Sequence, residues 1–213
     1  MTHGEIRDRL IAQRVVPVLR LASAELTERA GACLADAGFT TVEITMTTPG
    51  AVELIRRLAR RLGPAFLVGA GTVLDPDAAQ RCVDAGARFL VSPCTVPRMA
   101  EVAHAAGCAA LFGGLTPTEI LTAHREGADI VKVFPASIGG PEYLRAVHAV
   151  FPESLLCPTG GVSLENMQAY LAAGAALVCA GNNIIDQDAL AAGDMARATA
   201  HARRFLHPDM APQ

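Results

Sequence analysis

The stretch Asp129-Ile-Val-Lys-Val-Phe-Pro135 holds the only lysine of the chain, Lys132, within an apolar and β-branched run. Such a run predicts a buried strand, where an ammonium group is costly because it must lose its water. The other seventeen residues counted as Lys or Arg are all arginines. Lysine can present a neutral amine and arginine cannot, so this position favours a Schiff-base nucleophile. The alternative is a snorkelling or ion-paired lysine.

The same unit recurs on both sides of this stretch: a short apolar strand, a turn, an amphipathic helix and, in most units, a closing glycine. The predicted strands are residues 15–21, 40–46, 66–73, 89–93, 109–115, 129–135, 155–161 and 176–181. The predicted helices are residues 4–14 before the first strand, and then 23–37, 49–62, 76–85, 96–106, 117–126, 141–150, 164–173 and 188–206.

Eight β/α units without a linker predict a single (β/α)8 TIM barrel of the α/β class with an extra N-terminal helix. The expected single domain has that helix at residues 1–14, the barrel at 15–207 and a tail at 208–213. The alternative fold is a doubly wound open sheet. The first strand, however, lacks the Gly-x-Gly-x-x-Gly turn that would favour it.

Composition excludes several classes of protein. Half of the 213 residues are apolar, which excludes a disordered chain. The net charge of −3, without a basic stripe, argues against a nucleic-acid partner. No apolar run reaches the length of a membrane span, and the first residues are too polar for a signal peptide, so we expect no membrane partner.

The six cysteines and six histidines are scattered along the chain. No Cys-x-x-Cys motif occurs and several cysteines lie in predicted strands, so we expect buried reduced thiols in a cytoplasmic protein. The histidines show no metal-ligand spacing, which predicts no metal site. We expect no cofactor.

In a parallel barrel, the chemistry lies at the C-terminal ends of the strands. Here those ends carry polar, charged or glycine residues, where a purely structural barrel would favour valine or leucine. In strand order they are Arg20, Glu43, Thr72, Pro93, Gly113-Gly114, Lys132, Gly160-Gly161 and Gly181-Asn182.

Polar Thr41, Glu43 and Thr45 alternate with apolar residues in the second predicted strand. Successive side chains of a strand point to opposite faces, so Glu43 is predicted to point into the barrel, on the strand opposite that of Lys132. The functional interpretation is a proton shuttle beside an amine nucleophile. The structural alternative is a buried Glu–Lys pair.

Glycine-rich turns close three further strands. Gly69-Ala-Gly-Thr72 lets a ligand approach the backbone, and the Thr72 hydroxyl can hold a carboxylate. Pro158-Thr-Gly-Gly161 and Ala180-Gly-Asn182 close strands seven and eight, where barrels often bind phosphate through backbone N–H groups. These two turns therefore favour a phosphate site, although ordinary turn glycines are the alternative.

Six motifs in order give the chain a family resemblance. They are Val42-Glu-Ile-Thr45, Val68-Gly-Ala-Gly-Thr-Val73, Val91-Ser-Pro93, Leu115-Thr-Pro-Thr-Glu119, Val131-Lys-Val-Phe-Pro-Ala136 and Pro158-Thr-Gly-Gly161. Together they resemble the class I pyruvate aldolases that cleave 2-keto-3-deoxy-6-phosphogluconate, 4-hydroxy-2-oxoglutarate and 2-keto-3-deoxy-6-phosphogalactonate. The resemblance covers nearly the whole chain. It implies a carbon–carbon lyase of Entner–Doudoroff carbohydrate metabolism that is a homotrimer without metal.

The resemblance also implies roles for individual residues. Lys132 would be the Schiff-base lysine and Glu43 the acid and base. The pyruvate half of the substrate would contact Arg20, Thr72, Pro93 and Phe134. The phosphate and aldehyde half would contact Thr159, Gly160, Gly161, Gly181 and Asn182.

Some positions depart from the family pattern. Gluconate-type members usually have an arginine where this chain has Thr47, and galactonate-type members resemble this chain in having an arginine at the position of Arg20. Thr159 is gluconate-type, since galactonate-type members have an apolar residue there. Asn182 follows Gly181 where a serine is common, and Leu111-Phe-Gly-Gly114 lacks the usual Pro-Gly.

The resulting hypothesis is a Schiff-base aldolase, with 2-dehydro-3-deoxy-6-phosphogluconate as the first substrate. The galactonate-derived isomer and 4-hydroxy-2-oxoglutarate are the alternatives. Two more distant hypotheses are a phosphate-binding isomerase or epimerase barrel, which would not require Lys132, and a non-catalytic sugar-acid-phosphate binding barrel, which would have no reason to keep both Lys132 and Glu43.

Overall fold

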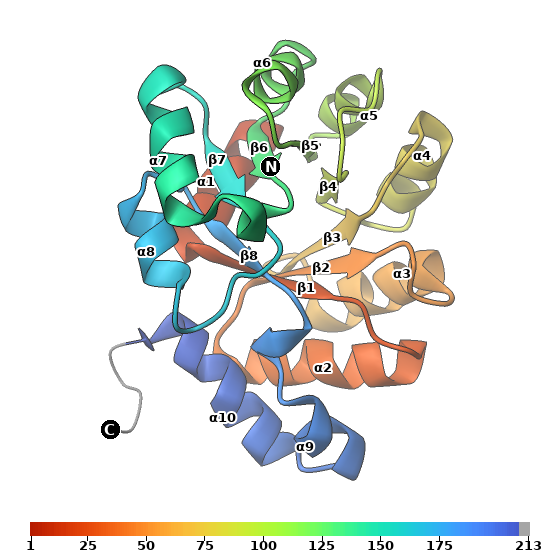
Figure 1. Ribbon diagram of the computed structural model, residues 1–213. Helices are drawn as coiled ribbons and strands as arrows, with labels where there is room; N and C mark the ends of the chain where they lie inside the picture. Colours follow the sequence, from red (N-terminus) through yellow and green to blue (C-terminus); the bar gives the residue numbers. More distant parts are fainter. Residues whose placement is uncertain (209–213) are drawn as a thin grey trace.

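Eight short parallel strands form one sheet in the order β7-β6-β5-β4-β3-β2-β1-β8 (Figure 1). The strands are β1 Val15–Leu19, β2 Thr41–Thr45, β3 Leu67–Gly71, β4 Phe89–Val91, β5 Ala109–Gly114, β6 Ile130–Val133, β7 Leu156–Pro158 and β8 Val178–Ala180. Two isolated bridges, Leu156 to Ala175 and Thr159 to Cys179, connect β7 to β8 and close the barrel. The predicted (β/α)8 barrel with its N-terminal helix is therefore confirmed in this computed structural model, which describes residues 1–208; residues 209–213 of the predicted tail lie outside that part.

Helices surround the sheet as the sequence pattern predicts (Figure 1). They are α1 His3–Gln13, α2 Ala24–Ala37, α3 Ala51–Leu62, α4 Pro76–Asp84, α5 Met99–Ala105, α6 Pro117–Arg125, α7 Gly140–Val150, α8 Met167–Ala172, α9 Gln187–Ala192 and α10 Met195–Leu206, with 3-10 turns η1 Ala136–Ile138 and η2 Asn182–Ile184. Among these described helices, none is long and apolar enough to cross a membrane.

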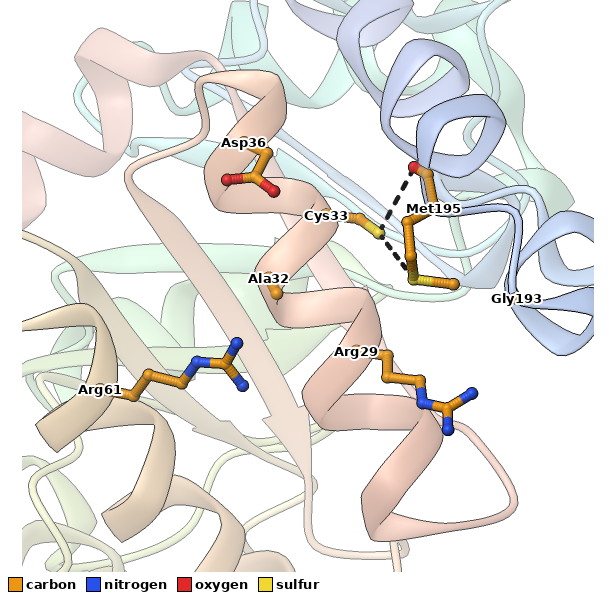
Figure 2. A pocket seen from close by; sticks show the side chains of 7 residues that line it. All are labelled: Arg29, Ala32, Cys33, Asp36, Arg61, Gly193 and Met195. Carbon is orange, nitrogen blue, oxygen red and sulfur yellow. Dashed lines mark hydrogen bonds between the residues drawn. The ribbon is translucent and has the colours of Figure 1, made fainter.

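The prediction of one continuous helix over residues 188–206 was wrong. Gly193 has a left-handed φ of 80° and ends α9, and the Asp194 side chain accepts from the N–H of Arg197 to start α10. The break leaves a hollow of about 360 Å³ against α2 and α3. Figure 2 shows that the Cys33 thiol points toward Met195 at the edge of this hollow, with its Sγ 3.7 Å from the Met195 sulfur. Arg29 and Arg61 at this hollow are paired with Glu25 and Glu28.

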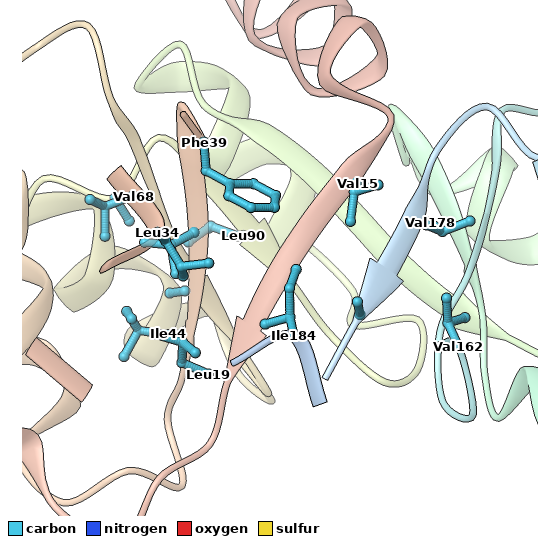
Figure 3. Packing of buried hydrophobic residues seen from close by; sticks show 14 of the residues in the cluster. Val15, Leu19, Leu34, Phe39, Ile44, Val68, Leu90, Val162, Val178 and Ile184 are labelled. Atoms are coloured by element: carbon cyan, nitrogen blue, oxygen red, sulfur yellow. The ribbon is translucent and has the colours of Figure 1, made fainter. Parts of the chain in front are cut away.

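Two apolar clusters hold the fold together. The outer one lies between sheet and helices and includes Leu34, Ile44 and Val178 (Figure 3). The inner one fills the barrel, where Phe89 and other strand residues meet Ile6 and Leu10 of α1. Ile6 and Leu10 are fully buried, so α1 covers the end of the barrel at which the strands begin.

All six cysteines are free thiols, as predicted. Five of them are buried, but Cys94 is exposed, because it lies in the loop after β4 and not in a strand. The expectation of burial was therefore wrong at this one position.

The carboxylate of Asp129, at the start of β6, joins α1 to α5. It accepts from His3 Nδ1 at 2.7 Å, from His104 Nε2 at 2.8 Å and from the N–H of Ala110 at 2.8 Å. The two imidazole rings stack at 4.1 Å, and the Asp129 side chain is only 4% exposed. Sequence reasoning missed this group because His3 and Asp129 are 126 residues apart. Its nitrogen and oxygen atoms are already paired with one another, which indicates a structural tether.

We expect Asp129→Asn to lower the free energy of unfolding by about 2–3 kcal/mol, because an amide cannot accept from both imidazoles and the backbone N–H. Urea unfolding measures the loss. His124→Gln is the control, since His124 lies on the exposed side of α6. If zinc chloride raised the melting temperature of the wild type but not of Asp129→Asn, His3, His104 and Asp129 would be a metal site instead of a tether.

Candidate active site

A cavity of about 740 Å³ opens at the C-terminal ends of the strands. All eleven site residues predicted from the sequence line it: Arg20, Glu43, Thr72, Pro93, Lys132, Phe134, Thr159, Gly160, Gly161, Gly181 and Asn182. Sequence reasoning missed Val18, Val162, Ser163 and Asn183, which also line it. Ser163 could have been found from its place directly after the Gly160-Gly161 turn. Gly113 and Gly114 line a neighbouring hollow instead.

Lys132 occupies the centre of β6, where Val131 and Val133 on either side pack into the outer cluster. The alternation of the strand therefore sends Lys132 into the barrel. Its side chain reaches the cavity, but the residue is only 6% exposed. Nζ lies 5.2 Å from the centroid of the Phe134 ring. Within residues 1–208 Lys132 forms no ion pair, so the predicted alternative of an ion-paired lysine is wrong for this part of the chain.

Glu43 lies in the middle of β2 and is 1% exposed. The strand order puts β2 four strands from β6, so the Glu43 and Lys132 strands face each other across the barrel as predicted. The carboxyl has room because Gly71 of β3 has no side chain; a Cβ there would overlap the carboxyl group.

Neither carboxyl oxygen of Glu43 has a hydrogen-bond partner among the described residues. Burial raises the pKa of Glu43 above its ordinary value, and the charges of Lys132 and Arg20 oppose that rise. A buried, unpartnered carboxyl is costly to the fold. It is well suited to accept and return a proton, because burial makes the protonated form more accessible than in an exposed glutamate.

Arg20 follows the last residue of β1 and is exposed at the cavity. The predicted structural alternative was a pair with Glu25 or Glu28, but Glu25 pairs with Arg29, and Glu28 with Arg57 and Arg61. Among the described residues, Arg20 has no carboxylate partner, which leaves its guanidinium available to an anion.

Thr72 and Thr47 differ in their relation to the cavity. Thr72 lines it and has a left-handed φ of 57°, a conformation that a β-branched residue adopts only at a cost. Thr47 takes the place of the family arginine, but its hydroxyl bonds Thr45 at 2.9 Å and it is not among the lining residues. Arg20 is therefore the arginine that the cavity presents.

The loops after β7 and β8 form the other side of the cavity. Gly160 and Gly161 have left-handed φ values of 86° and 81°, and a Cβ on Gly161 would come within 2.7 Å of Ser137. Backbone turned in this way exposes N–H groups to an anion. Thr159 is buried beside them, and its hydroxyl makes two long contacts, 3.4 Å to the carbonyl of Cys157 and 3.9 Å to the Sγ of Cys157.

The family model for KDPG and KHG aldolases matches residues 6–201. The 2-dehydro-3-deoxy-phosphogluconate aldolase of Pseudomonas aeruginosa is 36% identical over 195 residues, which is 91% of this chain and 88% of that protein. The 2-dehydro-3-deoxy-6-phosphogalactonate aldolase of Escherichia coli is 34% identical over 166 residues, 78% of each chain.

A solved structure shares this architecture. The KDPG aldolase of Legionella pneumophila, with pyruvate captured at low pH as a covalent carbinolamine intermediate, superposes with a TM-score of 0.84 at 28% identity. The match covers 95% of this chain and 97% of that one.

Proposed function

Since the chain belongs to the KDPG and KHG aldolase family, we propose that it is a Schiff-base aldolase that cleaves 2-dehydro-3-deoxy-6-phosphogluconate to pyruvate and glyceraldehyde 3-phosphate. The observation that carries the proposal is the meeting of Lys132 and the unpartnered Glu43 in one cavity. An amine that adds to a ketone and a group that moves the protons are the two requirements of this chemistry.

The first half of the reaction uses the free amine of Lys132. Nζ adds to the C2 ketone of the substrate to give a carbinolamine, and loss of water gives an iminium ion. Glu43 supplies the proton with which the hydroxyl group leaves. The iminium then serves as an electron sink for the bond that must break.

In the second half, ionised Glu43 takes the proton of the C4 hydroxyl, directly or through water. The C3–C4 electron pair moves toward the iminium, which releases the aldehyde and leaves an enamine on Lys132. Protonation at C3 and addition of water then free pyruvate and return the amine. The raised pKa of Glu43 suits a group that must both give and take a proton in one cycle.

Thr159 supports the gluconate-derived substrate over its galactonate isomer. Its hydroxyl lies at the cavity wall without a short hydrogen bond to the described residues, so it can bond a substrate hydroxyl. A hydrogen bond that one epimer makes and the other does not changes kcat/KM strongly, because the poorer substrate leaves a buried polar group unpaired.

A coupled assay of pyruvate release tests the function with four substrates: the two phosphorylated sugar acids and their unphosphorylated counterparts. We expect the phosphorylated gluconate derivative to give the highest kcat/KM. A higher kcat/KM for the galactonate derivative, or for 4-hydroxy-2-oxoglutarate as a fifth substrate, would make that compound the preferred substrate instead. No pyruvate from any of them would favour the isomerase or binding-protein hypotheses.

Arg20 is proposed to hold the substrate carboxylate, together with Thr72. Arg20→Met should raise KM for pyruvate by roughly 10- to 100-fold, the equivalent of about 1.5–3 kcal/mol of charged hydrogen bonding. Adding Thr47→Arg should recover part of that loss from the neighbouring strand. Arg29→Met on the outer face of α2 is the matched control. If Arg20→Met only lowered the melting temperature, Arg20 would be structural.

Assembly, compartment and pathway are further parts of the proposal. Family membership supports a homotrimer that acts in Entner–Doudoroff carbohydrate metabolism, with no partner other than its small substrate. The free thiols of the described residues support a reducing, cytoplasmic compartment. Light scattering on the purified protein tests the proposed trimer. A molar mass that corresponds to a monomer would refute it.

A further inference from the structure

The side-chain amide of Asn182 bonds the backbone of Arg20 at both of its polar groups. Oδ1 accepts from the N–H of Arg20 at 2.9 Å, and Nδ2 donates to its carbonyl at 2.7 Å. Regular pairing between β1 and β8 ends at Pro17 and Ala180. Beyond this point the two backbones separate, and the Asn182 side chain supplies the next pair of hydrogen bonds between the two segments in place of the backbone.

Asn166 uses the same pair of bonds in the loop after β7. Its Oδ1 accepts from the N–H of Ser163 at 2.9 Å, and its Nδ2 donates to the carbonyl of Gly161 at 2.7 Å. The Asn166 bonds stay within one loop, whereas Asn182 connects two segments that are 162 residues apart. What Asn182 holds is thus the main chain of Arg20.

Without the Asn182 amide, Arg20 would follow a strand end that is paired on one side only, through Leu19 to Ile44 of β2. Ordering such a segment on binding would weaken binding. With its N–H and carbonyl both fixed, only the side-chain torsions of Arg20 remain free. The Arg20 side chain therefore extends from a fixed backbone position at the mouth of the cavity. Among the described residues that line the cavity, Arg20 and Lys132 are the only cationic ones.

We propose that Asn182 is a positioning residue that fixes the backbone of Arg20, so that the guanidinium is ready for the substrate carboxylate. This inference rests on the proposed aldolase function. It replaces the prediction that Asn182 acts on the phosphate half of the substrate. Asn182 Nδ2 donates only one hydrogen bond to the described residues, so its second amide hydrogen is available. Direct phosphate binding is therefore the alternative that the experiment must distinguish.

Solvent exchange of the C3 protons of pyruvate in D2O, followed by NMR, isolates the carboxylate half, because pyruvate has no phosphate. Asn182→Ala should raise KM for pyruvate about tenfold and change kcat less than about threefold. Asn182→Asp should show the same split, because it loses the donor to the Arg20 carbonyl. In the Arg20→Met background, Asn182→Ala should add nothing to KM, because the two residues act as one unit.

Asn166→Ala is the matched control. It removes the same two bonds from the neighbouring loop, so it should cost similar stability but leave KM for pyruvate within about twofold. The inference is wrong if Asn182→Ala matches Asn166→Ala in pyruvate exchange, or if its effect adds to that of Arg20→Met. An increase in KM only for phosphorylated substrates would make Asn182 a phosphate ligand. Absence of exchange in the wild type would instead refute the aldolase function itself.

Discussion

Sodium borohydride added with pyruvate will convert the wild-type chain to one stable adduct, on the peptide that contains Lys132. Nζ and the C2 ketone form an imine with loss of water, and hydride reduces the C=N bond to a secondary amine. Because Lys132 is the only lysine, the N-terminal amine is the only other aliphatic primary amine of the chain. Intact-protein and peptide mass spectrometry can therefore assign the adduct without ambiguity.

Lys132→Arg will form no adduct and release no pyruvate above background, because a guanidinium keeps its proton and cannot attack a ketone. Lys132→Met is the companion variant that removes the charge as well. Circular dichroism should show that both keep the fold, since a buried charge is not needed for packing. An active enzyme whose Lys132 stays unmodified would refute the Schiff-base mechanism.

Glu43→Gln should lower turnover by roughly two to four orders of magnitude, because an amide cannot carry the proton. Pyruvate should still be trapped by borohydride, but slowly, since the amine remains. Asp84→Asn, on the outer side of α4, is the control for loss of one carboxylate. Turnover within a few-fold of the wild type would return Glu43 to a structural role.

The same variant should be more stable than the wild type at alkaline pH. Burial raises the pKa of Glu43 in the folded protein above its ordinary value of 4.5. The wild type therefore gains stability from protonated Glu43 below about pH 4.5 and loses that gain as pH rises through the folded-state pKa. Glutamine is neutral throughout, so urea unfolding should show a difference between the two proteins that grows with pH. A constant difference would mean that Glu43 has the same pKa in the folded and the unfolded protein, so that burial does not raise it.

The main residues of the site could be predicted because each depends on local rules. Strand alternation is enough to turn Glu43 inward, and eight repeated units bring the strand ends to one mouth. Lys132 stood out because the desolvation cost of a lysine in an apolar strand favours a functional role over a structural one.

Other features depend on three-dimensional contacts between distant segments. The tether formed by His3, Asp129 and His104 exists because three elements meet at the bottom of the barrel. The same holds for Asn182: its amide was free to face the cavity or β1, and no local pattern distinguishes the two. The break at Gly193 was also missed, since the amphipathic pattern continues through it and a glycine within a helix is tolerated at about 1 kcal/mol.

The closure of the barrel between β7 and β8 differs from its other seven strand boundaries. Two isolated bridges join these strands, whereas the other neighbours pair along continuous ladders. The proposed anion site spans this seam, with Gly160 on one side and Gly181 on the other. A bound phosphate would then connect the loops after β7 and β8, where isolated bridges take the place of a continuous ladder between the neighbouring strands. Phosphate binding would stabilise the closed barrel, because the ligand binds only when the two loops are in place. The amide hydrogens of β7 and β8 would therefore exchange more slowly when the phosphorylated ligand is present.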